Sequence, residues 1–533
     1  MGADFSRVRF NPLLDYAGVE LQQGRALLDS DANEQMAIAD RRLRALASDA
    51  LGRAAVSSTT PEAFKITVAA GALLIGKGRL YVDGLLAENH GATSTDRAER
   101  AFDDLLGETS FAEPVRYDTQ PYLPNAPALP GAGRHLVYLD AWDREITHLE
   151  QPDLIDPAVG VDTTSRVQRV WQVRALADEA GAGITCGSPD ADVPGWSAII
   201  APSTGVLSTG TSGGYRGLEN QLYRVEIHDA GQPGAGATFK WSRNNASIGS
   251  RVASVISETE LELQTLGRDM LRFNTGDWVE IIDDVRELSQ AAGEMRRITV
   301  FEATRRIQFT PALPTAMLPR SFPDRIFPRV RHLRVRRWDQ KGQIFRTDPN
   351  GRSVQVQDLD AAGSTGVIAV PRGGTTLLLE NGVTVSFAST GTKGFRAGDY
   401  WVFAARTADA SVETLDGAPP RGIDHHYARL GLLDVAAGTV IDCRNPWPPR
   451  GGHDSSTGDK LALGSAIAGG AIAAALIETL FDKGTFTLEE SRTVLEHALR
   501  NVSVHHPADG AREAGDIITG LMRDRFSARR ETP

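Results

Sequence analysis

Short segments in which apolar and polar residues alternate make up most of the chain, at residues 64–69, 73–89, 135–150 and 169–176 among others. This period of two is typical of half-buried β-strands. Glycine and proline residues, 53 and 27 in number, are spread along the chain and predict many turns between short strands. With 533 residues, the chain is too long for one hydrophobic core. The pattern therefore predicts a mainly β protein made of several small β-barrel or sandwich units.

One N-terminal segment departs from this alternation. Gln22, Gln23 and Gly24 predict a turn, and a helix is expected from about Ala32 to a stop at Gly52. Asp31 with Glu34 has the spacing of a capping box. The helix would present one apolar stripe, formed by Met36, Ala39, Leu43, Leu46, Ala47, Ala50 and Leu51. Since this helix precedes any β core, we expect it to dock on a neighbour or to mediate oligomerisation.

The same segment contains Asp29, Asp31 and Asn33, the alternating oxygen ligands with which an EF-hand loop begins. Glu34 occupies the position that needs glycine, and Asp40 the position that needs a bidentate glutamate. We therefore interpret these residues as turn and cap residues and predict no metal site.

Helical periodicity returns after Pro449. Residues 461–477 form a run of 17 residues without charge, but its alanines and glycines are too weakly apolar to predict a membrane span. We expect a C-terminal helical module with helices over residues 471–481, 488–500 and 512–526. Thr487 and Glu490 have capping-box spacing at the start of the second helix.

A partial internal repeat supports the β architecture. Residues 273–278 (FNTGDW) and 395–401 (FRAGDYW) share a phenylalanine, a Gly-Asp pair and a tryptophan, and an apolar segment follows each copy. Such a unit predicts a tight Gly-Asp turn that leads into a strand. Two copies indicate two related barrels or sandwiches, since a solenoid would need more copies at a shorter period.

These patterns divide the chain into five predicted regions. They are an N-terminal docking strand, turn and helix (1–56), a first β domain (57–213), a second β domain with the repeat (214–410), an irregular linker (411–460) and the C-terminal helical module (461–533).

Several sequence blocks resemble a known family. They include FNPLLDYAGVELQQGRALLDSDANEQ from Phe10, HLVYLDAWDREITHLE from His135, and FKWSRNNAS from Phe239. The chain resembles, over roughly residues 10–449, a large bacterial family of uncharacterised proteins that occur with phage-tail-like contractile injection systems. The resemblance implies a particle component of the baseplate or fibre kind, and it carries over no catalytic residue.

Charge and cysteine content narrow the choice of partner. The net charge of −11 argues against nucleic acid and anionic membranes, so we expect protein partners. Two cysteines, Cys186 and Cys443, are too few for a disulfide framework, and we expect both to be small buried apolar residues. The N-terminus has no signal-peptide pattern. We therefore expect cytoplasmic synthesis, followed by incorporation into a particle that acts outside the cell.

Seven arginines lie between Arg320 and Arg337, beside a single acidic residue, Asp324. Arg329, Arg331, Arg334 and Arg336 alternate with Val330, His332, Leu333 and Val335 in a strand-like pattern. An arginine face suits docking to protein carboxylates. Internal ion pairs and an anionic ligand are the alternatives. Together with Gln22, Gln23 and Arg25 of the N-terminal turn, these four arginines form the predicted interface.

Trp241, Arg243, Asn244 and Asn245 could bind a sugar by ring stacking and amide hydrogen bonds, although the asparagines also suit a simple turn. His425 and His426 are adjacent, so in a strand they point to opposite faces and should not share a metal.

Asp143 and Glu145 would lie on one face of a strand, opposite Trp142 and Ile146. We interpret that face as solvated and not as an acid/base pair.

No Walker loop, nucleophile elbow or zinc-protease motif occurs in the chain, and we predict neither an enzyme nor a cofactor. The favoured hypothesis is a structural or interaction subunit of a phage-tail-like contractile injection particle, as a homotrimer or homohexamer. The alternative hypothesis is a carbohydrate-binding or carbohydrate-cleaving protein.

Overall fold

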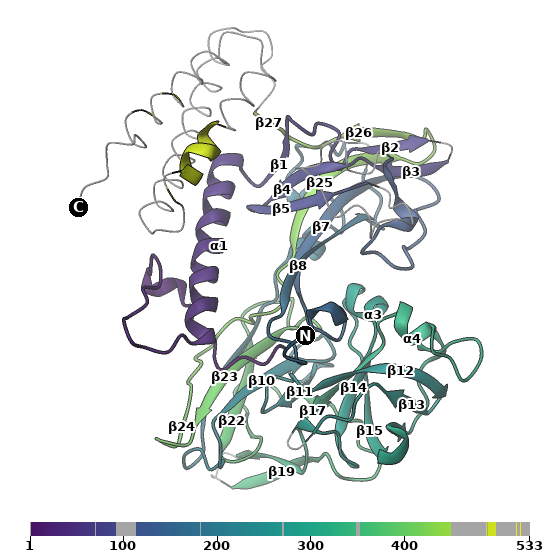
Figure 1. Cartoon of the computed structure of the whole chain (residues 1–533). Helices are drawn as coiled ribbons and strands as arrows, with labels where there is room; N and C mark the ends of the chain where they lie inside the picture. The colour runs from purple at the N-terminus through teal and green to yellow at the C-terminus, as the bar shows by residue number, and fades with distance from the viewer. Residues whose placement is uncertain are drawn as a thin grey trace. The chain divides into compact units, whose positions relative to one another are not determined.

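The computed structural model describes residues 2–69, 71–91, 113–181, 183–268, 271–347 and 352–448, together with 487, 489–496, 519 and 523. The chain divides into two compact units, Met1–Asn445 and Pro446–Pro533. The first unit consists mainly of antiparallel sheets, so the predicted mainly β class is confirmed (Figure 1).

Three sheets of the first unit share one hydrophobic core. One has the order β1-β4-β5, another β2-β3-β6, and the third β26-β25-β7-β8. The strands are β1 (Ala54–Ser57), β2 (Ile66–Ala69), β3 (Ala72–Ile75), β4 (Gly78–Val82), β5 (Leu85–Asn89), β6 (Val115–Arg116), β7 (Arg134–Ile146), β8 (Arg166–Ala175), β25 (His426–Asp434) and β26 (Thr439–Asp442). Strand β7 is buried on both faces from His135 to Trp142, so the predicted half-buried pattern with a solvated side is wrong for most of the strand. Near its end, Asp143 forms an ion pair with Arg169 on β8.

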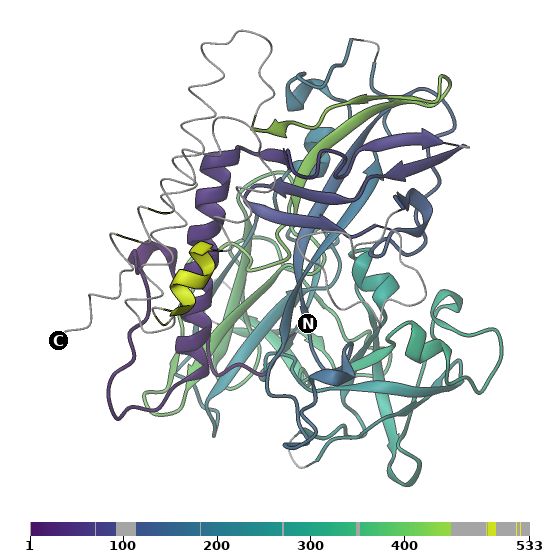
Figure 2. The same ribbon diagram turned by 45° about the horizontal axis from the view of Figure 1, so that its top comes forward.

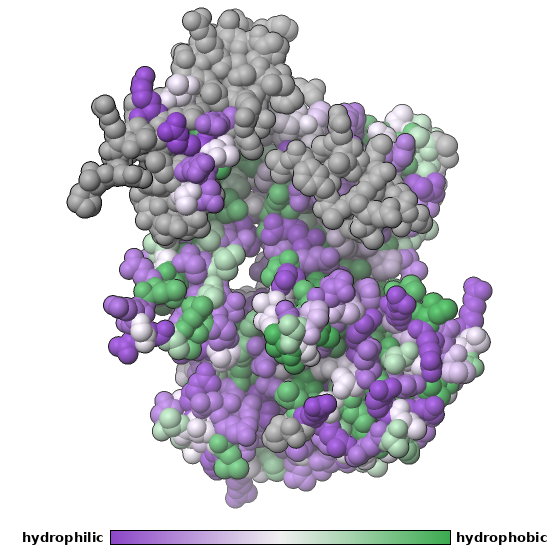
Figure 3. All heavy atoms as spheres, viewed as in Figure 1, coloured by the Kyte–Doolittle hydropathy of each residue, from purple (hydrophilic) through white to green (hydrophobic). Residues whose placement is uncertain are grey.

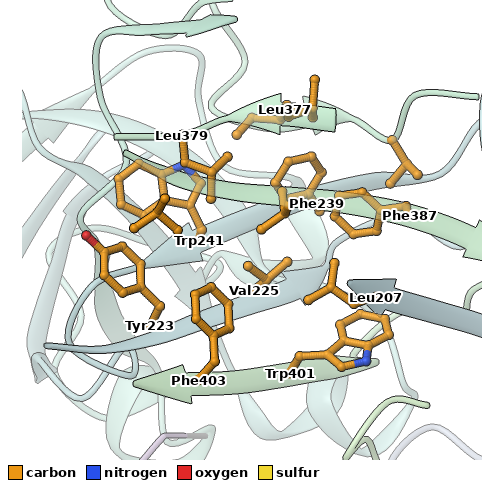
Figure 4. Packing of buried hydrophobic residues seen from close by; sticks show 14 of the residues in the cluster. Leu207, Tyr223, Val225, Phe239, Trp241, Leu377, Leu379, Phe387, Trp401 and Phe403 are labelled. Carbon is orange, nitrogen blue, oxygen red and sulfur yellow. The ribbon is translucent and has the colours of Figure 1, made fainter. Parts of the chain in front are cut away.

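Two five-stranded sheets enclose a second core, rich in aromatic residues, and form a sandwich (Figure 4). Their strand orders are β20-β11-β10-β23-β24 and β19-β18-β21-β22-β9. The strands are β9 (Gly205–Thr211), β10 (Gln221–Ile227), β11 (Thr238–Ser242), β18 (Gln343–Thr347), β19 (Ser353–Asp358), β20 (Ile368–Ala369), β21 (Thr376–Leu378), β22 (Val383–Ser389), β23 (Tyr400–Arg406) and β24 (Ser411–Val412).

A closed barrel of order β12-β13-β16-β15-β14-β17 occurs in the sequence between sandwich strands β11 and β18. Its interior is filled by apolar side chains, so it is a packed core and not a channel. The strands are β12 (Gly249–Ser257), β13 (Glu260–Leu263), β14 (Trp278–Ile282), β15 (Glu294–Phe301), β16 (Arg306–Phe309) and β17 (Arg334–Trp338).

Helices are few among the described residues of the first unit. The longest is α1 (Asp29–Leu51), and the others are α2 (Trp196–Ile200), α3 (Asp284–Leu288) and α4 (Phe327–Val330). Short 3-10 turns are η1 (Pro12–Leu14), η3 (Tyr117–Thr119), η4 (Pro152–Leu154), η5 (Asp190–Asp192), η7 (Glu302–Thr304) and η8 (Thr315–Met317). Both ribbon views show α1 along the outside of the sheets of the first unit, not between two layers (Figures 1 and 2).

Helix α1 ends at Gly52, as predicted, but it begins at Asp29, before the expected start. The N-cap residue is Leu28, which has no capping side chain, so the predicted capping box at Asp31 and Glu34 is wrong. Asp31 instead lies in the first helical turn and forms an ion pair with Arg9 at 2.8 Å. The turn at Gln22 is confirmed, because Arg25 N donates to Gln22 O and Gly24 has φ of 71°.

The two copies of the repeat form the same turn, which confirms that prediction. In each copy the Asp carboxylate accepts a hydrogen bond from the backbone N three residues earlier, Asn274 to Asp277 and Arg396 to Asp399, both at 2.8 Å. The glycine of each turn has positive φ and hydrogen-bonds the neighbouring strand. The turns lead into β14 of the barrel and β23 of the sandwich, so the same type of turn precedes a strand in two different β units.

The structure corrects the predicted domain limits. Strands β25 and β26 lie in the segment predicted as an irregular linker, and they pair with each other and with β7 of the N-terminal region. Strand β9 lies in the predicted first β domain but pairs with β22 of the sandwich. The alternating pattern identifies strands in such segments, yet it says nothing about which distant strand completes each sheet.

In the second unit the capping box of Thr487 and Glu490 is confirmed. Glu490 N donates to Thr487 Oγ1 at 3.2 Å, and Thr487 N donates to Glu490 Oε2 at 2.8 Å. Residues 489–496 are helical. The uncharged run of residues 461–477, most of the other predicted C-terminal helices and the remainder of the predicted module lie outside the described residues. No helix within the described ranges is long and apolar enough to cross a membrane.

Candidate functional site

Five charged side chains gather where the β10–β11 sheet meets the barrel, and we call them the central charge cluster: Arg224, Glu226, Lys240, Glu280 and Arg336. Glu226 and Lys240 are cross-strand neighbours on β10 and β11. Glu280 and Arg336 are cross-strand neighbours on barrel strands β14 and β17. The cluster is therefore built from two cross-strand ion pairs, one contributed by the sandwich and one by the barrel.

Each carboxylate of the cluster contacts both inner cations. Lys240 Nζ lies 2.6 Å from Glu280 Oε1 and 3.2 Å from Glu226 Oε1. Arg336 Nη2 lies 3.0 Å from Glu280 Oε2 and 3.5 Å from Glu226 Oε1. Lys240 and Glu280 side chains are each only 1% exposed. Because buried charges are stable only when they are paired, these contacts tie the barrel to the sandwich sheet.

Aromatic rings and backbone donors complete the surroundings of the cluster. Trp338 Nε1 donates to Glu280 Oε2 at 3.1 Å, and Gly293 N donates to Glu280 Oε1 at 2.9 Å. The guanidinium of Arg224 stacks 3.7 Å from the centre of the Tyr400 ring. A side chain at Gly293 would begin 2.5 Å from Glu280 Cγ, so only glycine lets the backbone approach this carboxylate.

The cations of the cluster lower the pKa values of its two glutamates and of the nearby His228. Burial raises the pKa of Glu226, but Lys240, Arg224 and Arg336 outweigh burial and lower that pKa to about 2. Burial likewise raises the pKa of Glu280, and Lys240 and Arg336 bring it well below its usual range. Burial lowers the pKa of the nearby His228, and Lys240 lowers it further, to about 4.

The cluster borders a cavity of about 140 Å³ that Arg144 and Glu287 also line. A glycoside-cleaving pair needs one carboxyl group that keeps its proton near neutral pH. Glu226 and Glu280 are both ionised, so this pair has no proton donor to offer. The arrangement suits a buried ion-pair network that holds the sandwich and the barrel together, and it does not support acid/base hydrolysis.

Acid should destabilise the protein from about pH 6.5 downward. The pKa of His228 is about 4 in the folded protein and about 6.5 when unfolded, so only the unfolded chain gains a proton between these values. The resulting stability is complete above pH 6.5 and decreases progressively as the pH falls from 6.5 to 4, a total loss of roughly 3 kcal/mol. Glu226 adds a further loss as the pH falls from 4.5 toward 2.

Urea unfolding at a series of pH values tests this expectation, with His228→Gln as the matched variant. The variant should lose most of the pH dependence between pH 6.5 and 5, where Glu226 does not yet titrate. Parallel stability curves for the two proteins over that range would contradict the role given to His228.

The arginine run is divided between the interior and the surface, which corrects the predicted arginine face. Arg334 is 0% exposed and pairs with Glu150, Asp284 and Glu287. Arg336 belongs to the central charge cluster. Arg331 pairs with the fully buried Asp283 at 2.5 Å.

Only Arg329, at the end of α4, is exposed among the four predicted docking arginines, and its role in docking stays a prediction. The expected alternation fails because residues 327–330 form α4 and β17 begins only at Arg334. His332, between the two elements, has φ of 47° and breaks any continuous strand.

The structure excludes ring stacking of a sugar on Trp241, the less favoured interpretation of residues 241–245. Trp241 is fully buried in the sandwich core, where Figure 4 shows it near Leu379 and Tyr223, so no ligand can stack on it. Arg243 pairs with Glu380 at 2.6 Å. The favoured interpretation as a turn is correct, because Asn245 has φ of 47° and Ser247 N donates to Asn244 O.

Asn245 instead holds the N-terminus in place. Its Nδ2 donates to Ala3 O at 2.7 Å, and Ala3 N donates to Glu145 Oε1 at 3.1 Å. A side chain at Gly2 would begin 1.8 Å from Asn245 O, so only glycine fits there. Ser6 Oγ then donates to Asp29 at 2.7 Å, at the start of α1. The chain that leads into α1 is thus attached to the β body.

Between these anchors, residues 10–28 form a surface loop, which Val19 N attaches to α1 by donating to Gln35 Oε1 at 2.6 Å. The predicted interface residues Gln22, Gln23 and Arg25 lie exposed on this loop. Six large apolar residues are exposed on it as well: Leu13, Leu14, Tyr16, Leu21, Leu27 and Leu28. Figure 3 shows apolar side chains on this side of the molecule, over the N-terminal loop.

Cys186 and Cys443 form a disulfide, with Cα atoms 5.1 Å apart, so the expectation of two separate apolar cysteines is wrong. His425 and His426 bind different carboxylates, Asp140 at 2.6 Å and Asp83 at 3.0 Å, as expected for opposite faces. Among the residues that the structure describes, no group of three or more His, Cys, Asp or Glu side chains is placed to hold a metal ion.

Sequence reasoning missed Glu226, Lys240 and Glu280. Each is a single charge between large apolar residues, as in Val225–Ile227, Phe239–Trp241 and Val279–Ile281. A period of two assigns such a charge to the solvent face. The signal that could have found them is the recurrence of opposite charges on strands that are apolar at every flanking position.

The family described as "Family of unknown function (DUF6519)" matches residues 1–186 and 206–454. No curated protein and no solved structure matches the chain.

Proposed function

The chain belongs to the DUF6519 family, whose description assigns no function, and we propose that it is a structural and interaction subunit of a phage-tail-like contractile injection particle. The observation that carries this proposal is the N-terminal surface, formed by residues 10–28 and α1. Nine large apolar side chains are exposed within residues 13–46: Leu13, Leu14, Tyr16, Leu21, Leu27, Leu28, Met36, Leu43 and Leu46.

Such a concentration of apolar side chains on a surface is typical of a protein interface. The chain is attached before the loop at Ala3 and Ser6 and within the loop at Val19, and these contacts restrict the loop before any partner binds. Preorganisation of this kind lowers the entropic cost of association. The N-terminal surface is therefore suited to permanent docking on neighbouring subunits of the particle.

Two further observations support the proposal. The charges of the central charge cluster are paired between the sandwich and the barrel, which suits a structural body rather than a site for acid/base chemistry. The Cys186–Cys443 disulfide supports a stage outside the cytoplasm, because disulfides persist in oxidising surroundings.

Replacement of four exposed leucines of the loop, Leu13→Ser, Leu14→Ser, Leu21→Ser and Leu27→Ser, tests the proposal. Because these side chains are exposed, we expect the variant to keep the melting temperature of the wild type but to be absent from tail-like particles purified from producing cells. Electron microscopy and quantitative mass spectrometry of the particles provide the measurement.

The matched control replaces exposed apolar residues elsewhere, Ile155→Ser, Val159→Ser, Val161→Ser and Leu218→Ser, and should be incorporated normally. Stoichiometric incorporation of the loop variant would overturn the docking role. A chain found only as a soluble monomer that degrades polysaccharide would replace the proposal by the carbohydrate hypothesis.

A further inference from the structure

Helix α1 is amphipathic, but its apolar stripe points away from the β sheets on which the helix lies. The buried side chains of the helix are Ser30, Glu34 and Ile38. Glu34 and Ile38 line a pocket together with residues 10–12, 15 and 16 of the N-terminal loop. Arg44 lies on the same side, with Nη2 3.1 Å from His426 Nε2. The backbone of the helix approaches the β4–β5 turn so closely that a side chain at Gly84 would begin 2.2 Å from Arg44 O.

The opposite side of α1 carries an exposed heptad pattern. Its apolar residues follow one another at alternating spacings of four and three, and all of them are exposed: Ala32, Met36, Ala39, Leu43, Leu46 and Ala50. Alternation of this kind places a and d positions along one seam of a coiled coil. Leu43, at the centre of the seam, is 65% exposed. One face of α1 therefore packs on the rest of the first unit, and the seam formed by these six residues is exposed.

The charges beside the seam indicate which helix pairs with it. Arg42 and Asp49 are both exposed and both occupy g positions, one heptad apart. In an antiparallel pair of two α1 helices, Leu43 faces Leu46 of the second copy, and Arg42 faces Asp49 of the second copy. The two-fold axis repeats each contact, so one helix sequence supplies two leucine contacts and two ion pairs. A parallel pair would place Arg42 opposite Ala47 and form no such ion pair.

We propose that α1 is a self-association helix that pairs in antiparallel fashion with α1 of a second copy of this chain. The inference rests on the proposed function in that it names the neighbour that the N-terminal surface binds. Ala39 faces Ala50 of the second copy in this register, and these small side chains let the helices approach closely at both ends of the paired segment, residues 39–50. A two-fold contact gives a dimer, or a hexamer of three such pairs, and not a simple three-fold ring.

Size-exclusion chromatography with light scattering on the purified full chain tests the inference. The wild type should have the mass of an even number of chains and dissociate on dilution. Leu43→Asp should give the mass of one chain, because each copy would place a charge against Leu46 of the other. Ala45→Asp is the matched control, since it adds the same charge at an exposed position outside the seam and should leave the mass unchanged. Circular dichroism should show the same fold in all three proteins.

A charge exchange tests the direction of pairing. Arg42→Asp should weaken self-association roughly tenfold, because both ion pairs become repulsive contacts. The double variant R42D/D49R should restore the wild-type dissociation constant. A failure of the double variant to restore association would overturn the antiparallel arrangement.

The masses of the wild type and of Leu43→Asp decide whether α1 mediates self-association. A single-chain mass at every concentration would overturn the inference, and it would indicate that residues of the same chain or a different protein cover the seam. An oligomer that Leu43→Asp leaves intact would also overturn it. Either result combined with normal incorporation of the chain into tail-like particles would reject self-association through α1 and leave the proposed function standing. Absence of the wild-type chain from particles would reject the proposed function instead.

Discussion

Replacement of Lys240 by methionine should lower the free energy of unfolding by about 3–5 kcal/mol, the range for removal of one partner from a buried ion pair. The side chain keeps its length, so little packing is lost. Glu226 and Glu280, both in contact with Lys240 Nζ, would remain buried with Arg336 as their shared inner cation. Their mutual repulsion would loosen the contact between the β10–β11 sheet and the barrel.

Urea unfolding followed by tryptophan fluorescence measures the effect, because Trp338 donates to Glu280 within the cluster. Lys65→Met is the matched control. Lys65 also forms an ion pair, with Glu62 at 2.7 Å, but the two side chains are 37% and 63% exposed. Its replacement should change the free energy of unfolding by less than about 1 kcal/mol. Equal effects of the two substitutions would show that the cluster is no more important than a surface pair.

Replacement of both cysteines, Cys186→Ser and Cys443→Ser, should lower the stability of the first unit by about 2–5 kcal/mol. The disulfide closes a loop with a sequence separation of 257, and closure of a long loop removes much entropy from the unfolded chain. It joins the segment after β8 to the end of β26, and both strands belong to one sheet. Calorimetry of the oxidised wild type and the double serine variant measures the difference.

Reductant provides the control for this second prediction. Dithiothreitol should lower the melting temperature of the wild type to that of the double serine variant and leave the variant unchanged. Identical melting temperatures for oxidised wild type and variant would show that the bond adds no stability. Mass spectrometry of the unreduced chain establishes that the bond has formed in the sample.

Several local features could be predicted from the sequence because they depend on neighbouring residues only. The Gly-Asp turns at Asp277 and Asp399, the helix stop at Gly52 and the cap at Thr487 each require groups within a few positions of one another. Backbone φ values and short-range hydrogen bonds determine such features. The alternation of apolar and polar residues likewise determined the mainly β class, because every strand must bury one face.

Long-range contacts decided the candidate site. Glu226, Lys240, Glu280 and Arg336 look like solvent-facing positions of four separate strands, and Cys186 and Cys443 look like two isolated residues. The apolar stripe of α1 was visible in the sequence, but its outward direction depends on what Glu34, Ile38 and Arg44 contact in the folded chain. A strand or helix specifies its own faces, whereas the sheet that packs on each face comes from distant residues. Burial of a charge is therefore decided by the tertiary structure, through the opposite charge that a remote strand brings to it.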